Sequence, residues 1–149
     1  MKTFTENKKA HFDYEFLEKF EAGLVLTGQE AKSIRLGRMK IIGSYVILRG
    51  NEAYLINSNI PPYQTKNTPE SYNSSRARKL LLNKSEIRYL IGKSQQEHLT
   101  LVPLRVYTKK EKIKLEFALA KGRKKADKKN LIKKRETDRE IKRELKIRG

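Results

Sequence analysis

Few side chains in this 149-residue chain have types suited to catalysis. There are two histidines, His11 and His98, and no cysteine, so thiolate nucleophiles, disulfides and thiolate-bound metals are excluded. Four carboxylates lie close together: Asp13, Glu15, Glu18 and Glu21. At strand spacing three of them share one face, which is typical of a solvated surface balancing nearby lysines rather than of paired-carboxylate chemistry. No Walker loop, HExxH or GxSxG motif is present, and we predict that the protein is not an enzyme.

The positive charge of the chain points to a different chemistry. Lys and Arg number 35 against 17 Asp and Glu, which gives a formal charge of +18. Half of the excess lies on residues 121–149, with 14 basic and 5 acidic residues. Such a density indicates an anionic partner, because Lys and Arg that neutralise phosphates release counterions. Six tyrosines could also stack on bases, namely Tyr45, Tyr54, Tyr63, Tyr72, Tyr89 and Tyr107.

Two capping-box patterns in the sequence predict two helices. Thr27 with Glu30 predicts a helix of about ten residues, which Gly37 ends in a left-handed conformation. Asn83 with Glu86 predicts a second helix, which ends near residue 92. Between the two helices, Arg76, Arg78 and Lys79 directly precede three leucines, so a strand there would place cations beside its buried face.

Alternating apolar residues predict the strands. Residues 45–56 form two apolar runs around Gly50 and Asn51, which suits a β-hairpin with a primed turn. Residues 99–107 and 113–120 predict a second pair. Residues 12–25 fit a strand and a helix equally well. Five or more strands with two or three short helices predict a mainly β protein, an OB-like antiparallel barrel.

The chain divides into a predicted barrel at 1–120 and a basic tail at 121–149. Residues 1–11 are interpreted as an arm that lies on the barrel or on a partner, and residues 64–75 as an exposed loop. The tail has no apolar face to bury, so it is expected to be disordered when free. It could be a solvated extension, a membrane-surface helix or an RNA-binding peptide, but it lacks the aromatic residues of a membrane helix. No apolar run approaches the length of a membrane span, so we expect a soluble, cytoplasmic protein.

Short sequence blocks resemble, in order, the motifs of the bacterial SsrA-binding protein family, also called small protein B. Together they extend over nearly the whole chain, and together they are far more specific than any block alone. The blocks are NKKA at 7–10, EAG at 21–23, GQEAKSIR at 28–35, SYV at 44–46, IPPY at 60–63, RARKLLL at 76–82, LVPL at 101–104 and LAKGRKKADKK at 119–129.

This resemblance implies a non-enzymatic adaptor of trans-translation, with no cofactor and no metal. The barrel would bind the tRNA-like domain of transfer-messenger RNA (tmRNA), and residues 12–25 would form a strand. The tail would become helical in the decoding centre and the empty mRNA channel of the small ribosomal subunit. Elongation factor Tu is an expected further partner, and the adaptor is expected to be a monomer. The composition alone fits an alternative equally well: a general basic OB-fold RNA-binding or ribosome-associated protein without tmRNA specificity.

The resemblance also implies which residues bind. The predicted RNA contacts of the barrel are Asn7, Lys8, Lys9, Glu30, Lys32, Ser33, Arg35, Arg76, Arg78 and Lys79. The predicted ribosome contacts of the tail are Gly122, Arg123, Lys124, Lys125, Asp127, Lys128, Lys129, Lys133, Lys134, Arg135, Arg139, Lys142 and Arg143. Glu30 has two interpretations, as a capping residue and as an acceptor of hydrogen bonds from RNA. Ala126 departs from the family pattern, which has His or an aromatic residue there.

Overall fold

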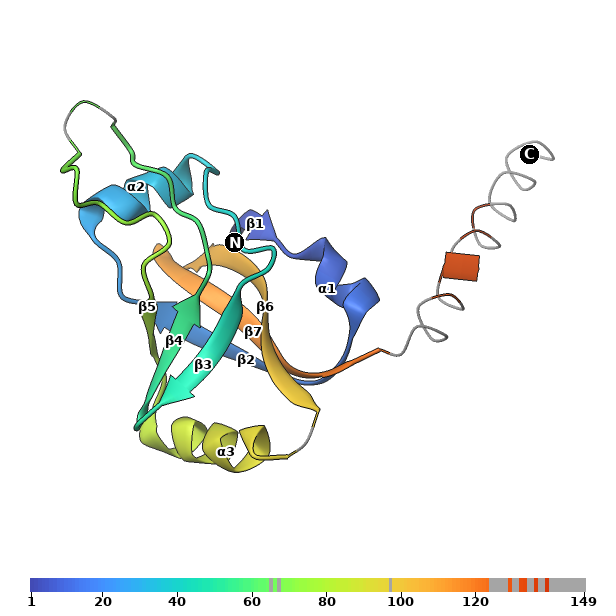
Figure 1. Cartoon of the computed structure of the whole chain (residues 1–149). Helices are drawn as coiled ribbons and strands as arrows, with labels where there is room; N and C mark the ends of the chain where they lie inside the picture. Colours follow the sequence, from blue (N-terminus) through green and yellow to red (C-terminus); the bar gives the residue numbers. More distant parts are fainter. Residues whose placement is uncertain are drawn as a thin grey trace.

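The computed structural model describes residues 1–64, 66, 68–96, 98–123, 129, 132, 133, 136 and 139. Figure 1 shows the order of the elements and a barrel with α3 at one end and α1 and α2 on different sides. The helices are α1 (Lys8–Asp13), α2 (Gly28–Arg35) and α3 (Lys84–Ser94). The strands are β1 (Lys2–Glu6), β2 (Tyr14–Leu24), β3 (Tyr45–Arg49), β4 (Glu52–Ile56), β5 (Arg78–Leu81), β6 (Leu99–Lys109) and β7 (Lys112–Gly122).

Six of these strands close into a ring. The sheet runs in the order β6-β3-β4-β5-β2-β7, and β7 pairs again with β6, while β1 is added to β6. All pairings are antiparallel. This arrangement confirms the predicted mainly β, OB-like barrel. Within the described residues, no helix is long and apolar enough to cross a membrane.

The N-terminal arm lies on the barrel rather than extending from it. Its first residues form β1 along β6, and α1 follows directly. Ala10 of α1 packs against Ala118 and Ala120 on the outer face of β7, so these two alanines are buried as completely as Phe117 on the inner face. The predicted alternation of β7 therefore holds, but the end of its outer face, at Ala118 and Ala120, is buried under α1, whereas Lys112 is exposed.

A β-bulge interrupts β2, the strand that covers most of the ambiguous residues 12–25. The register of β2 against β7 shifts between Phe16 and Glu18, which leaves Leu17 unpaired and 48% exposed. Before the bulge Phe16 packs on the outer face with α1, whereas after it Phe20 packs on the barrel core. A bulge adds one residue to a strand. The even-numbered residues of β2 therefore point to the outer face before the bulge and to the barrel core after it.

The predicted turns and caps are present, with small shifts of the boundaries. Gly50 has φ of +61° in the turn between β3 and β4, and Gly37 has φ of +75° after α2. α2 has eight residues rather than ten, and α3 continues past Gly92 to Ser94. The turn between β6 and β7 is shorter than expected, with positive φ at Lys110 and Glu111.

The caps supply a first prediction about stability. Thr27 Oγ1 accepts a hydrogen bond from the Glu30 amide at 3.2 Å, and the corresponding bond at α3 runs from the Glu86 amide to Asn83 at 2.8 Å. We expect Thr27→Ala and Asn83→Ala each to lower the free energy of unfolding by about 1 kcal/mol. Urea denaturation measures both. A loss below about 0.3 kcal/mol in either variant would show that its cap adds little stability.

Candidate nucleic-acid interface

Exposed cations gather where α2 meets the β4–β5 connection and the β6–β7 turn. Lys32 and Arg35 lie in the last turn of α2, and Arg38 follows the helix. The Lys32 ammonium is 5.4 Å from the centre of the Tyr63 ring, and Arg38 Nη1 donates to the Tyr63 carbonyl at 3.1 Å. Arg35 Nη2 donates to the Glu111 carbonyl at 3.1 Å. Three segments far apart in the sequence therefore share one basic surface.

A buried ion-pair network lies directly beneath this surface. The side chains of Glu30 and Arg78 are both fully buried. Arg78 Nε donates to Glu30 Oε2 at 2.9 Å, and Arg78 Nη2 is 2.8 Å from the same oxygen. Arg76, whose side chain is 37% exposed, pairs with the other carboxylate oxygen. One carboxylate thus binds two arginines, and the opposite charges offset the cost of burying them.

The same network holds the β4–β5 connection against α2. Arg78 Nη1 donates to the Ser74 carbonyl at 2.9 Å and to Ser58 Oγ at 3.3 Å. Ser33 Oγ, on α2, donates to the Pro61 carbonyl at 2.6 Å. Because these contacts join both halves of the connection to the helix and to β5, its backbone is fixed close to the basic surface.

Glu30 is ionised at neutral pH in this arrangement. Burial raises the pKa of the Glu30 carboxyl, but hydrogen bonds from Arg76, the Thr27 amide and Arg78 together outweigh it and lower the pKa below its ordinary value. The Thr27 amide donates to Glu30 at 2.9 Å, which confirms the interpretation of Glu30 as a capping residue, whereas its hydrogen bonds to RNA stay a prediction.

Four of the predicted RNA contacts are buried: Asn7, Glu30, Ser33 and Arg78. Asn7 Nδ2 donates to the Pro103 carbonyl at 3.2 Å, and Asn7 Oδ1 accepts from the Ala10 amide at the start of α1. In this structure the four residues bind other parts of the protein, so they support the surface rather than form it. Their contact with RNA stays a prediction.

The orientation of β5 corrects one expectation. The strand was expected to place its cations beside the buried face, and Lys79 does lie outside, 3.0 Å from Glu52. Arg78, however, lies on the buried face together with Leu80, because successive side chains of a strand point to opposite sides. Its charge is accommodated there by Glu30.

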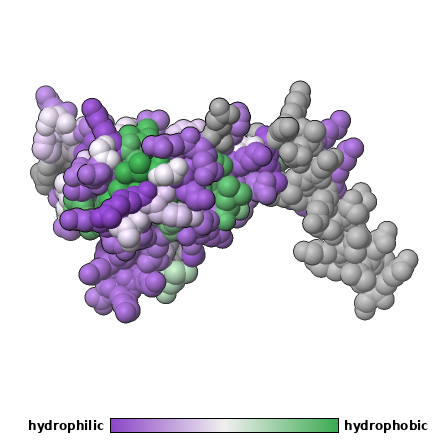
Figure 2. Space-filling view, turned by 90° about the horizontal axis from the view of Figure 1, so that it is seen from below, coloured by the Kyte–Doolittle hydropathy of each residue, from purple (hydrophilic) through white to green (hydrophobic). Residues whose placement is uncertain are grey.

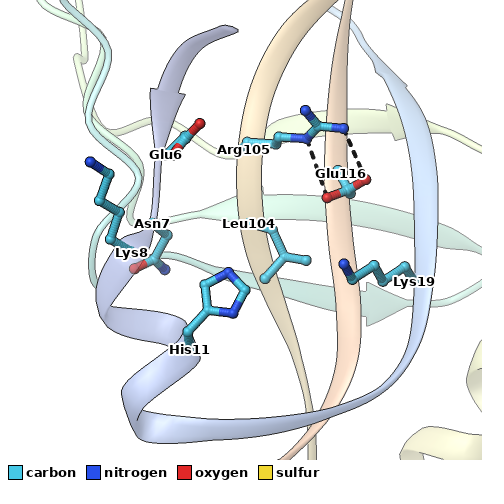
Figure 3. A pocket seen from close by; sticks show the side chains of 8 residues that line it. All are labelled: Glu6, Asn7, Lys8, His11, Lys19, Leu104, Arg105 and Glu116. Atoms are coloured by element: carbon cyan, nitrogen blue, oxygen red, sulfur yellow. Dashed lines mark hydrogen bonds and ion pairs between the residues drawn. The ribbon is translucent and has the colours of Figure 1, made fainter. Parts of the chain in front are cut away.

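Lys8 and Lys9 are exposed on α1, away from the α2 surface (Figure 1). Figure 3 shows the pocket beside Lys8, of about 260 Å³, with Lys19 on the side of the ion pair between Arg105 and Glu116 and Lys8 on the opposite side. Sequence reasoning missed this pocket, because its walls come from β1, α1, β2, β6 and β7. The described residues contain no His, Asp and Glu cluster that could hold a metal.

The opposite end of the barrel has a different surface. Seen from the end that carries α3, the described residues are largely hydrophilic, with apolar side chains in smaller patches (Figure 2). Tyr89 on α3 is 42% exposed, and the centre of its ring lies 5.6 Å from the Lys93 ammonium. The Tyr89 hydroxyl donates to the Glu18 carboxylate at 2.6 Å. Here an acidic group accompanies the lysine and the aromatic ring.

The start of the tail belongs to the barrel. Gly122 pairs with Tyr14 at the end of β7, and the Arg123 amide donates to the Asp13 carbonyl at 2.8 Å. Lys129, Lys133 and Arg139 are exposed. The other predicted tail contacts lie outside the described residues, namely Lys124, Lys125, Asp127, Lys128, Lys134, Arg135, Lys142 and Arg143. The predicted disorder of the tail therefore stays a prediction.

The chain is similar along nearly its whole length to proteins of known name. A family model described as SmpB protein matches residues 4–147. An SsrA-binding protein of Malacoplasma penetrans is 48% identical, covering 99% of this chain and 100% of the relative. A second SsrA-binding protein, of Trichormus variabilis, is 46% identical, covering 97% of this chain and 94% of the relative. A chain of a solved structure described as "tmRNA-SmpB: a journey to the center of the bacterial ribosome" is 43% identical, with a TM-score of 0.67 over 81% of this chain and 85% of that one.

Proposed function

The chain belongs to the SmpB protein family, and from this membership we propose that it is an RNA-binding adaptor, not an enzyme. It binds the tRNA-like domain of tmRNA and delivers this RNA to stalled ribosomes for trans-translation, in which the stalled peptide is tagged. The observation that carries the proposal is that the similarity to SsrA-binding proteins includes both the barrel and the tail. The match to the Malacoplasma penetrans relative covers 100% of that protein's length.

The two parts of the chain have separate roles in this function. The barrel presents fixed cations on α2 and beside α1, which suit the sugar-phosphate backbone of a folded RNA. Beyond Arg123 the tail has 12 basic and 5 acidic residues, and it binds in the decoding centre and the empty mRNA channel, where phosphates neutralise its charge. From the family membership we further infer that the adaptor acts in the cytoplasm together with elongation factor Tu. We also infer that it is a monomer, because the closed ring leaves few strand edges for a second copy.

Selectivity for tmRNA is the measurement that tests the proposal. We expect the full chain to bind the tRNA-like domain at least about tenfold more tightly than an ordinary tRNA, at low and at high salt. Shape-specific contacts survive salt, whereas the counterion contribution falls for both RNAs alike. Filter binding or fluorescence anisotropy across a salt series measures this. Equal affinities that fall together with salt would instead support the general RNA-binding alternative.

A further inference from the structure

The structure distinguishes Tyr63 from the other tyrosines that the sequence offered for base stacking. Tyr63 is half-buried, and its ring contacts the Lys32 ammonium while its carbonyl accepts from Arg38. The other five hydroxyls are bound within the protein: Tyr45 to Tyr14, Tyr54 to Glu52, Tyr72 to the Ile60 carbonyl, Tyr89 to Glu18 and Tyr107 to Glu21.

The charges around Tyr63 favour an anionic ligand. Lys32, Arg35 and Arg38 are all exposed, and within the described part of the chain no carboxylate forms an ion pair with them. An aromatic ring beside exposed cations is typical of surfaces that stack on bases and contact the neighbouring phosphates. Tyr89 also lies beside a lysine, but its hydroxyl binds a carboxylate, which repels phosphate.

The backbone that carries Tyr63 is held in place before any ligand binds. The Pro61 carbonyl accepts from Ser33, and the Ile60 carbonyl accepts from the Tyr72 hydroxyl at 2.6 Å. The Ile60 amide donates to the Ser74 carbonyl at 2.9 Å, and the same carbonyl accepts from the buried Arg78. Because these contacts hold the backbone next to Tyr63, little backbone entropy is lost when a ligand stacks on its ring.

We propose that Tyr63 is a stacking platform for an unpaired nucleobase of the bound RNA, with Lys32 and Arg38 on the flanking phosphates. The base stacks on the ring, and the Lys32 ammonium moves from the ring to a phosphate. This contact deepens the proposed function and rests on it, since that function identifies the ligand as RNA. The buried Glu30 and Arg78 hold the platform without touching the base.

The absence of tryptophan from the chain allows a direct test. In the Tyr63→Trp variant, we expect saturation with the tRNA-like domain to quench the tryptophan emission, because a stacked base quenches an indole. The matched control is Tyr89→Trp, whose ring also lies near a lysine but at the α3 end. Its emission should not change. An unchanged emission for Tyr63→Trp, or equal quenching in both variants, would overturn the proposal.

Affinities of further variants separate stacking from charge. Tyr63→Phe keeps the ring and should bind like the parent chain, whereas Tyr63→Ala should bind the tRNA-like domain about 5- to 150-fold more weakly. Neither change should alter the salt slope. Lys32→Gln should reduce the slope by about 0.7 to 0.9, the effect of one lost phosphate contact. Thermal melting checks that the variants fold.

The two proposals fail in different ways in this experiment. If Tyr63→Ala binds as tightly as the parent chain while the parent still prefers the tRNA-like domain, the stacking platform is wrong and the proposed function stands. If the parent chain shows no preference between the tRNA-like domain and an ordinary tRNA, the proposed function is wrong whatever the Tyr63 variants do.

Discussion

A chain ending at Arg123 is expected to bind the tRNA-like domain within about tenfold of the full chain but to lose at least about 100-fold in peptide tagging. The 26 residues removed carry 12 basic and 5 acidic side chains, which is the charge proposed to bind in the mRNA channel. The barrel keeps its strands, because the Arg123 amide still bonds to Asp13 and Arg123 Nε to the Tyr14 carbonyl at 3.2 Å.

A reconstituted translation reaction on an mRNA without a stop codon measures the tagging, and a binding titration measures the affinity. A second truncated chain, which ends at residue 120, is the structural control. It removes the pairing of Glu15 with Lys121 and of Tyr14 with Gly122, so it should melt at a lower temperature than the chain ending at Arg123. Normal tagging by the chain that ends at Arg123 would contradict the role proposed for the tail.

The parts of the fold that sequence predicts well depend on neighbouring residues. A capping box joins residues three apart, and both boxes, at Thr27 and Asn83, are present. The β3–β4 hairpin depends on two apolar runs and the turn at Gly50, all within twelve residues. Because the interacting groups are close along the chain, their spacing alone carries the structural information.

The parts that sequence does not predict depend on distant partners. Residues 1–11 contain a strand and the start of α1, but β1 is stabilised by β6, about a hundred residues later. Ala118 and Ala120 are likewise buried in a cluster that contains the distant Ala10. The bulge at Leu17 leaves the parity of the apolar residues unchanged while it changes the face, so no period in the sequence reveals it.

The buried network under the basic surface was half predictable. In β5 the alternation of Arg78, Lys79 and Leu80 already places Arg78 on the side of Leu80, which is buried. Charge composition favoured an exposed role for both cations, and the alternation is the signal that contradicts it. The partner carboxylate Glu30 is 48 residues away, so only the folded chain identifies the pair.

The largest effect on stability is expected from Glu30→Gln. The glutamine keeps the shape and the capping box of the carboxylate, since Gln also serves at this position. It removes the charge that two arginines share, and leaving a buried Arg78 without its partner costs about 3–5 kcal/mol of unfolding free energy. Glu52→Gln is the matched control, because its pair with Lys79 is 45% exposed on both sides, where solvent screens the two charges and the loss of unfolding free energy should be small.

Acid should abolish this difference between the parent chain and Glu30→Gln. The pKa of Glu30 is lowered in the folded protein, so its contribution is complete above the ordinary value of 4.5 and is lost as the pH falls through the lowered value. The Gln variant has no such group. Denaturant unfolding from about pH 7 to about pH 3 should therefore show two stabilities that converge. A constant difference across this range would contradict the charge of Glu30 as the source of the stabilisation. A difference below about 1 kcal/mol at pH 7 would mean that the two arginines find other partners.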